Sequence, residues 1–185
     1  MTAWAVGRLL VATPKLTDPN FARTVVYVVA HDEDGAFGIV LNRPLEKPPL
    51  AEVLPLWAGH AALPVAVFQG GPVEPAMALG LARRDSSAAM PGWTPVGCGA
   101  GLVDLAMTPN EPGLALVTVR IFTGYAGWGA GQLEGEIAES AWFVIDGKPT
   151  DLFTADPDRL FHDVLRRQPG HLAMFAHFPP DPTAN

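Results

Sequence analysis

The stretch that most constrains the fold is residues 24–44, in which two apolar runs flank a short polar segment. Residues 24–30 are TVVYVVA and residues 36–41 are AFGIVL, and neither run alternates apolar with polar side chains. Runs of this length, rich in β-branched residues and bounded by turn residues, predict a β-hairpin of two strands buried on both faces. The sheet that holds them must therefore be covered on both sides.

Two glycines and a proline shape this hairpin. We expect Gly35 to take left-handed dihedral angles and to close a five-residue loop over residues 31–35. Gly38 lies inside the second strand, where a missing side chain predicts a bulge or the close passage of another backbone. Pro44 has no N–H to donate and restricts the residue before it, so strand pairing should end there.

The rest of the chain alternates short apolar runs with segments rich in glycine and proline. Apolar runs of strand length predict further strands at residues 7–12, 64–69, 76–82, 114–122 and 141–145, and a strand or sheet edge at 101–105. Helical spacing predicts a short helix at 50–54, a helix at 132–138, and an amphipathic helix that begins at Asp156-Pro157. The ending, 178–185, should be extended.

Composition limits the class of protein. The chain has 185 residues, of which 49% are hydrophobic and 17% charged, so we expect one domain over residues 1–185 with a sizeable core. No stretch approaches the ~20 apolar residues of a membrane span, and the N-terminus lacks the pattern of a signal peptide, which predicts a cytoplasmic protein. The net charge of −7 argues against direct binding of nucleic acid, which depends on clustered Lys and Arg.

The sequence contains no assembled catalytic or metal-binding pattern. Cys98 is the only cysteine, which excludes an internal disulfide, and no base is visible beside it, so we expect a small buried or half-buried thiol without a catalytic role. The five histidines show no HxH or HExxH spacing, and the acidic tip at 32–34 lacks the ligand spacing of a calcium loop. We therefore assign no catalytic residue, metal or cofactor and favour a protein that is not an enzyme.

The strand, loop and helix expected over residues 114–138 are the best candidate for a ligand site. The glycine-rich loop at 123–131 could present backbone N–H groups to an anion, beside the N-terminus of a helix. Its spacing matches neither the GxGxxG fingerprint nor a P-loop. The alternative, which we favour, is a tight turn in which Tyr125 and Trp128 pack on the core.

Two arginines border apolar strands. Arg43 and Arg120 each need a carboxylate or carbonyl partner if the side chain is buried. A structural salt bridge is the expected role, and binding of an anion is the alternative.

Several motifs together resemble the YqgE/AlgH family. They are GRLLVATP at 7–14, GAFGIVLNRP at 35–44, GGPV at 70–73 and GYAGWGAGQLE at 124–134, and the pattern extends over nearly the whole chain. The resemblance implies an α+β fold: a branched, mainly antiparallel sheet with a small barrel-like portion, flanked by helices. It implies no established activity, cofactor or catalytic residue, although some members carry a transcriptional-regulator label.

Three functions stay open at this point. The first, which we favour, is a cytoplasmic, non-enzymatic interaction or regulatory module with an unknown protein partner. Another is a transcriptional regulator. The remaining one is a small-molecule or anion-binding protein, or an enzyme, in which three motif loops converge. Its ligand-binding residues would be Asn42, Arg43, Gly70, Gly71, Tyr125, Trp128 and Gln132. No oligomeric state is predicted.

Overall fold

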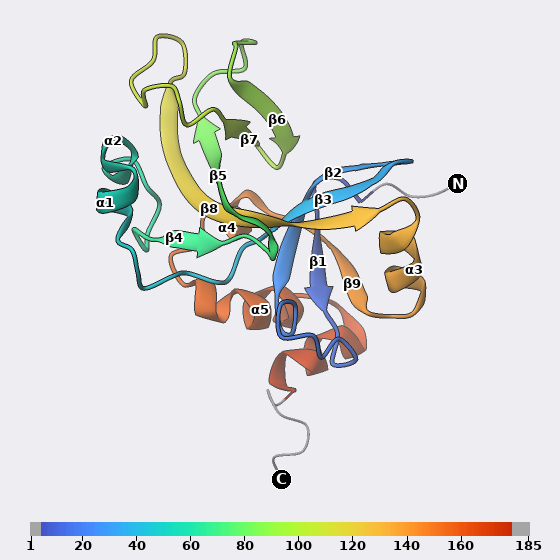
Figure 1. Ribbon diagram of the computed structural model, residues 1–185. Helices are drawn as coiled ribbons and strands as arrows, with labels where there is room; N and C mark the ends of the chain where they lie inside the picture. The colour runs from blue at the N-terminus through green and yellow to red at the C-terminus, as the bar shows by residue number, and fades with distance from the viewer. Residues whose placement is uncertain (1–4, 179–185) are drawn as a thin grey trace.

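The computed structural model describes residues 5–178, and within them nine strands form one curled, mostly antiparallel sheet (Figure 1). Across the sheet the strands follow the order β6-β7-β5-β8-β3-β2-β1-β9, and β4 joins at β8. The strands are β1 (Arg8–Ala12), β2 (Val25–Asp32), β3 (Gly35–Val40), β4 (Val67–Gln69), β5 (Val73–Arg84), β6 (Trp93–Gly97), β7 (Ala100–Val103), β8 (Leu116–Gly129) and β9 (Trp142–Asp146).

The helices are short and lie around this sheet (Figure 1). They are α1 (Leu50–Val53), α2 (Pro55–Ala58), α3 (Gln132–Ala138), α4 (Pro149–Leu152), α5 (Pro157–Arg166) and the 3₁₀ helix η1 (Gly170–His177). The sheet branches at β8, which pairs with β5 along one edge and with β4 and then β3 along the other. The predicted fold class, a mixed α+β fold built on a branched and mainly antiparallel sheet, is confirmed.

The central hairpin is buried on both faces, as the unbroken apolar runs predict. Strands β2 and β3 pair in antiparallel register, with Val26 opposite Val40. Because successive side chains on a strand point to opposite faces, Tyr27 packs in the core beneath α5 while Val26 and Val28 pack in the core on the α3 side. A third core cluster joins Trp57 of α2 to β4, β5 and β8.

The turn of this hairpin is shorter than the sequence suggested. Only Glu33 and Asp34 lie between the strands, so the predicted five-residue loop is wrong. His31 remains in β2 and is buried, because its ring finds partners within the fold. Gly35 has φ +141°, and a Cβ there would lie 2.1 Å from the Trp128 carbonyl oxygen, so the glycine permits close approach to β8.

Gly38 lies where another backbone passes closely, as its position inside a strand predicts. A Cβ on this residue would lie 2.7 Å from Cγ1 of Val26 and 3.0 Å from the Tyr27 carbonyl oxygen. The pairing register shifts nearby, between Val28 and Ala30, which marks a β-bulge in the partner strand. Close approach and a bulge therefore occur together.

The glycine-rich segment after residue 122 is a strand and not a loop. The predicted strand at 114–122 is present, but β8 continues through Gly129, so the predicted loop at 123–131 is wrong over most of its length. A Cβ on Gly124 would lie 2.4 Å from the Gly71 carbonyl oxygen. The glycines of β8 allow neighbouring backbones to approach. Gly131, at φ +72°, follows the strand and is the N-cap residue of helix α3.

Most remaining elements agree with the sequence, with several additions. Helices α3 and α5 and strands β1, β4, β5, β7 and β9 lie within or overlap the predicted segments. The sequence did not predict α2, β6, α4 or η1. Asp156 occupies the position before α5 and Pro157 its first turn, but the Asp156 side chain makes no capping hydrogen bond. The predicted extended ending includes Phe178, and residues 179–185 lie outside the described part.

Replacing Tyr27 with phenylalanine is expected to change how stability depends on alkaline pH. The fully buried Tyr27 hydroxyl donates to the Val96 carbonyl oxygen at 2.6 Å. Burial, with a smaller contribution from Cys98, raises the Tyr27 pKa well above its ordinary value of 10.0. Above pH 10 the unfolded chain loses this proton before the folded one does, so the wild-type free energy of unfolding falls by about 1.4 kcal/mol per pH unit from this group.

The contribution of the Tyr27 hydroxyl proton to the free energy of unfolding is thus intact below pH 10. It is lost as the pH rises from 10 toward the raised pKa of the folded state. Tyr27→Phe removes this loss, at the cost of about 1 kcal/mol at neutral pH for the missing hydrogen bond. Urea unfolding of both proteins across the range from about pH 8 to about pH 11 measures the difference. Two curves that stay parallel over this range would contradict the assignment.

Candidate functional site

The three motif stretches meet through their backbones. Gln69 N–H donates to the Arg43 carbonyl oxygen and Gly70 N–H donates to the Thr123 carbonyl oxygen, each at 2.8 Å. A Cβ on Gly71 would lie 2.1 Å from the carbonyl carbon of Tyr125. Residues 42–44, 70–72 and 123–125 are therefore packed directly against each other, with little space between them.

Asn42 fixes the loop that precedes β2. Its side-chain oxygen accepts a hydrogen bond from the Val25 N–H at 3.0 Å, and its Nδ2 donates to the Arg23 carbonyl oxygen at 2.9 Å. Arg23 has φ +58°, in the left-handed region that side-chain-bearing residues rarely adopt. Asn42 thus holds the backbone of Arg23 in a conformation that costs about 1–2 kcal/mol by itself.

Arg43 holds the same loop from another position. Its Nη2 donates to the carbonyl oxygens of Pro19 at 2.8 Å and Ala22 at 3.2 Å. Burial lowers the Arg43 pKa, and the nearby Asp18 carboxylate opposes that shift. Within residues 5–178 Arg43 forms no salt bridge, so the expected salt bridge is wrong; the half-buried guanidinium binds backbone carbonyls instead and supports the loop at 18–24.

Trp128 and Gln132 belong to a separate cluster at the α3 end of the sheet. One Glu136 oxygen, Oε2, accepts from Nε1 of Trp128 at 2.9 Å and from Nε1 of Trp142 at 2.8 Å. The other oxygen accepts from Nε2 of Gln132 at 3.0 Å. Tyr125 lies apart from this cluster and packs at a tilt against Phe37, with ring centroids 4.7 Å apart and an interplanar angle of 48°. The structure thus divides the seven sequence-predicted residues between two regions.

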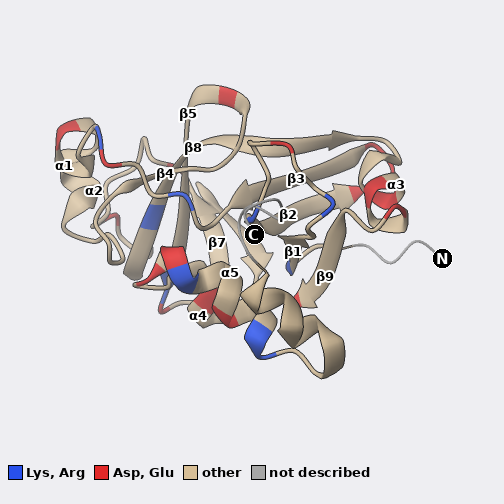
Figure 2. Ribbon diagram, turned by 90° about the horizontal axis from the view of Figure 1, so that it is seen from below, with Lys and Arg blue, Asp and Glu red and all other residues tan. Residues whose placement is uncertain are grey.

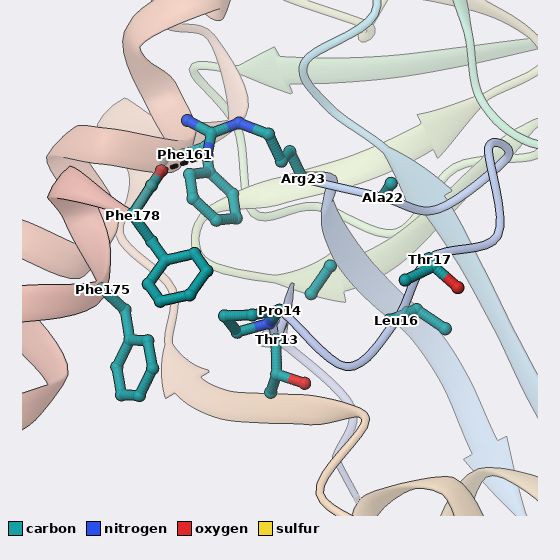
Figure 3. Close-up of a pocket in the computed structure, with 10 residues that line it drawn as sticks. Thr13, Pro14, Leu16, Thr17, Ala22, Arg23, Phe161, Phe175 and Phe178 are labelled. Atoms are coloured by element: carbon teal, nitrogen blue, oxygen red, sulfur yellow. Dashed lines mark hydrogen bonds between the residues drawn. The ribbon is translucent and has the colours of Figure 1, made fainter. Parts of the chain in front are cut away.

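A cavity of about 150 Å³ lies beside the loop that Asn42 and Arg43 support. Phe175 and Phe178 stand on one side of it and Thr13 and Pro14 on the other, with Arg23 at the edge (Figure 3). Its walls come from the loop after β1, from α5 and from the end of the described chain, and they consist of Ala12, Thr13, Pro14, Leu16, Thr17, Ala22, Arg23, Phe161, Phe175 and Phe178.

The guanidinium of Arg23 is held against an aromatic ring at the edge of the cavity. Its central carbon lies 4.6 Å from the centroid of the Phe161 ring, within the range of a cation–π interaction. Its Nη1 donates to the Phe178 carbonyl oxygen at 2.8 Å (Figure 3). Within residues 5–178 Arg23 forms no ion pair with a carboxylate. The positive charge is thus fixed in place without a counter-charge from the described residues.

None of the seven residues predicted from the sequence lines this cavity, and Arg23 was not singled out. Its lining segments, 12–23 and 161–178, are far apart in the sequence, and their apolar side chains look like ordinary core residues. The available signal was indirect: Asn42 and Arg43 are polar residues at the end of an apolar strand, and both bind backbone of the segment at 19–25.

No described group of side chains suggests a metal centre. Within residues 5–178, no three His, Cys, Asp or Glu side chains gather where they could hold a metal ion. His31 Nδ1 accepts from the Ala5 N–H at 3.1 Å, so its Nε2 carries the proton and faces Glu134 Oε1 at 3.2 Å. Cys98 is half-buried, with its sulfur 3.6 Å from the carbonyl oxygens of Gly7 and Gly147. No helix described here is long and apolar enough to cross a membrane.

The fold and its sequence motifs define a known class. A family model described as AlgH-like matches residues 9–173, so the chain belongs to the AlgH-like family. A UPF0301 protein of Streptomyces coelicolor is 50% identical over 183 residues, which cover 97% of this chain and 94% of that protein.

Two solved structures are also similar to this chain. The crystal structure of protein DIP2367 from Corynebacterium diphtheriae matches with a TM-score of 0.87 at 29% identity, covering 96% of this chain and 94% of that one. The solution structure of the AlgH protein from Pseudomonas aeruginosa matches with a TM-score of 0.69 at 30% identity, covering 96% and 95%. These likenesses agree on the fold and carry no statement of an activity.

Proposed function

We propose that this chain is a non-enzymatic regulatory module that binds a small molecule in the cavity beside Arg23. The observation that carries the proposal is the cavity itself: about 150 Å³, walled mainly by apolar side chains and bordered by a fixed cation. Ligand sites are typically concave and apolar with a few placed polar groups. A cavity of about 150 Å³ lined by apolar side chains is large enough to hold benzene.

The family motif at 42–43 has a role in this proposal. Asn42 and Arg43 do not touch the ligand and act as positioning residues, because each binds backbone of the loop that forms one wall. Gly70, Gly71 and Tyr125 maintain the sheet contact from which Asn42 and Arg43 extend. In this account the sequence motifs serve binding indirectly, through the shape of the wall.

Direct regulation through DNA has less support. The net charge is −7, and Lys and Arg positions are scattered over several elements among Asp and Glu positions (Figure 2). Duplex DNA is bound by neutralising its phosphates with clustered cations. A regulatory role would therefore depend on the small ligand or on a protein partner.

Filling the cavity tests the proposal. Benzyl alcohol, a neutral one-ring probe, is expected to bind the wild-type protein saturably in ligand-detected NMR. Ala22→Leu adds three carbons at the cavity wall and should abolish this binding, while Ala89→Leu, an exposed position outside the cavity lining, should not. Circular dichroism verifies that both variants fold. Absence of binding to the wild type, or equal binding by a folded Ala22→Leu variant, would refute the proposal.

A further inference from the structure

Arg23 gives the cavity a chemical preference as well as a shape. Of the residues that line it, Arg23 alone is charged, and the lining contains no Asp or Glu. A guanidinium has five N–H donors, and the described residues accept from one nitrogen of Arg23, Nη1, at the Phe178 carbonyl. Donors therefore remain at the edge of an otherwise apolar site.

Arg23 is held by one contact to its backbone and two to its guanidinium. Asn42 donates to the Arg23 carbonyl oxygen, the Phe178 carbonyl accepts from Nη1, and the guanidinium carbon lies 4.6 Å from the centroid of the Phe161 ring. A held guanidinium loses little side-chain entropy when it binds a ligand, and its fork of N–H groups matches the two oxygens of a carboxylate. The geometry therefore favours a planar, bidentate acceptor.

The remaining walls distinguish a carboxylate from a phosphate. Three phenylalanine rings, a leucine and a proline offer no hydrogen bonds, so they suit an apolar body. Thr13 Oγ1 is already used, because it donates to the Ser140 carbonyl oxygen and accepts from the Lys15 N–H. Thr17 adds a single hydroxyl to the lining. A phosphate would bring more oxygens than one guanidinium and one hydroxyl satisfy, whereas a carboxylate on a ring brings two.

From this arrangement we infer that the ligand is a compact aromatic monocarboxylate, with its ring among Phe161, Phe175 and Phe178 and its carboxylate on Arg23. The inference rests on the proposed function and adds the ligand class to it. Binding is reversible and involves no covalent step. The ring supplies burial of apolar surface, and the charge-assisted hydrogen bonds to Arg23 supply the selectivity.

The experiment compares benzoate with benzyl alcohol and benzamide, which share the ring but carry no charge. Isothermal titration of the wild-type protein should show benzoate binding about tenfold or more tightly than either neutral probe, since hydrogen bonds to charged groups are worth more than neutral ones. Arg23→Gln should remove that preference and leave benzyl alcohol binding within about twofold. Arg166→Gln removes the same charge at an exposed position outside the cavity lining and should leave the preference for benzoate unchanged.

The outcomes separate the two proposals. If benzyl alcohol binds the wild type but benzoate has no advantage, or if Arg23→Gln keeps the benzoate preference, the carboxylate inference is wrong and the cavity proposal stands. If no probe binds the wild type, both fail. If Arg23→Gln no longer binds benzyl alcohol either, the Arg23→Lys variant provides the test. Lysine keeps the positive charge but not the planar fork, so some preference for benzoate over benzyl alcohol should remain. Absence of any such preference in Arg23→Lys would overturn the inference.

Discussion

Replacing Arg120 with methionine is expected to lower the free energy of unfolding by about 3 kcal/mol. Arg120 is 1% exposed in the middle of β8, with its guanidinium 4.5 Å from the centroid of the Phe68 ring. It donates to the carbonyl oxygens of Leu63 at 2.6 Å, Thr154 at 2.7 Å and Leu152 at 3.3 Å. The side chain thus ties two segments to the sheet, and its removal leaves their carbonyls unpaired.

Two effects of opposite sign act at this arginine. Burial lowers the pKa of Arg120 to about 10, which means that the folded state bears a cost for keeping the charge at neutral pH. Methionine relieves that cost but leaves one buried and two part-buried carbonyl acceptors without this donor, and each lost hydrogen bond to a charged group is worth about 1.5–3 kcal/mol. With several acceptors affected, the loss of hydrogen bonds outweighs the relief.

Urea unfolding at neutral pH measures the Arg120→Met effect. The control is Arg83→Met on the neighbouring strand β5, where the side chain is exposed and the change should be within about 0.5 kcal/mol. A variant at Arg120 as stable as the wild type would show that the carbonyl contacts add no net stability.

Gly71→Ala is the second large effect we expect, with a loss of about 3 kcal/mol or a failure to fold. Gly71 has φ +155°, and a Cβ there would lie 2.1 Å from the carbonyl carbon and 2.2 Å from the carbonyl oxygen of Tyr125. Backbone atoms within the sheet cannot move aside as a flexible side chain would. The strands must separate at the point where three sequence motifs meet.

A matched glycine serves as the control for Gly71. Gly135 lies within α3, and an added Cβ there would meet nothing within 4 Å. Gly135→Ala should therefore stabilise the protein by about 0.5–1 kcal/mol through the lower flexibility of the unfolded chain. Thermal and urea unfolding report both variants, and a Gly71→Ala protein with wild-type stability would refute the close approach.

The sequence predicts the sheet better than the turns within it. Residues 24–30 and 36–41 predict buried strands because side chains on both faces are apolar, and that pattern does not depend on distant partners. Gly124 and Gly35 were misassigned because a glycine needed for close approach looks the same in a sequence as one needed for a turn. The distinction depends on which backbone passes nearby, which is a tertiary property.

The cavity could not be predicted from the same pattern. Phe161 and Phe175 are apolar residues in helices, and a side chain that lines a cavity has the same composition signal as one that fills a core. Arg23 depends on a left-handed backbone conformation that Asn42 supports from another strand end. The sequence marks Arg43 as a charged residue beside an apolar strand and Asn42 as a candidate ligand-binding residue, but the partners of both depend on the tertiary fold.

A two-dimensional amide NMR titration of the wild-type protein with benzoate locates the ligand on the fold. We expect saturable shifts that concentrate around the cavity, at Thr13, Leu16, Arg23, Phe161 and Phe175. Absence of saturable shifts at these residues, or shifts centred instead on the Trp128 and Gln132 cluster, would contradict binding in this cavity.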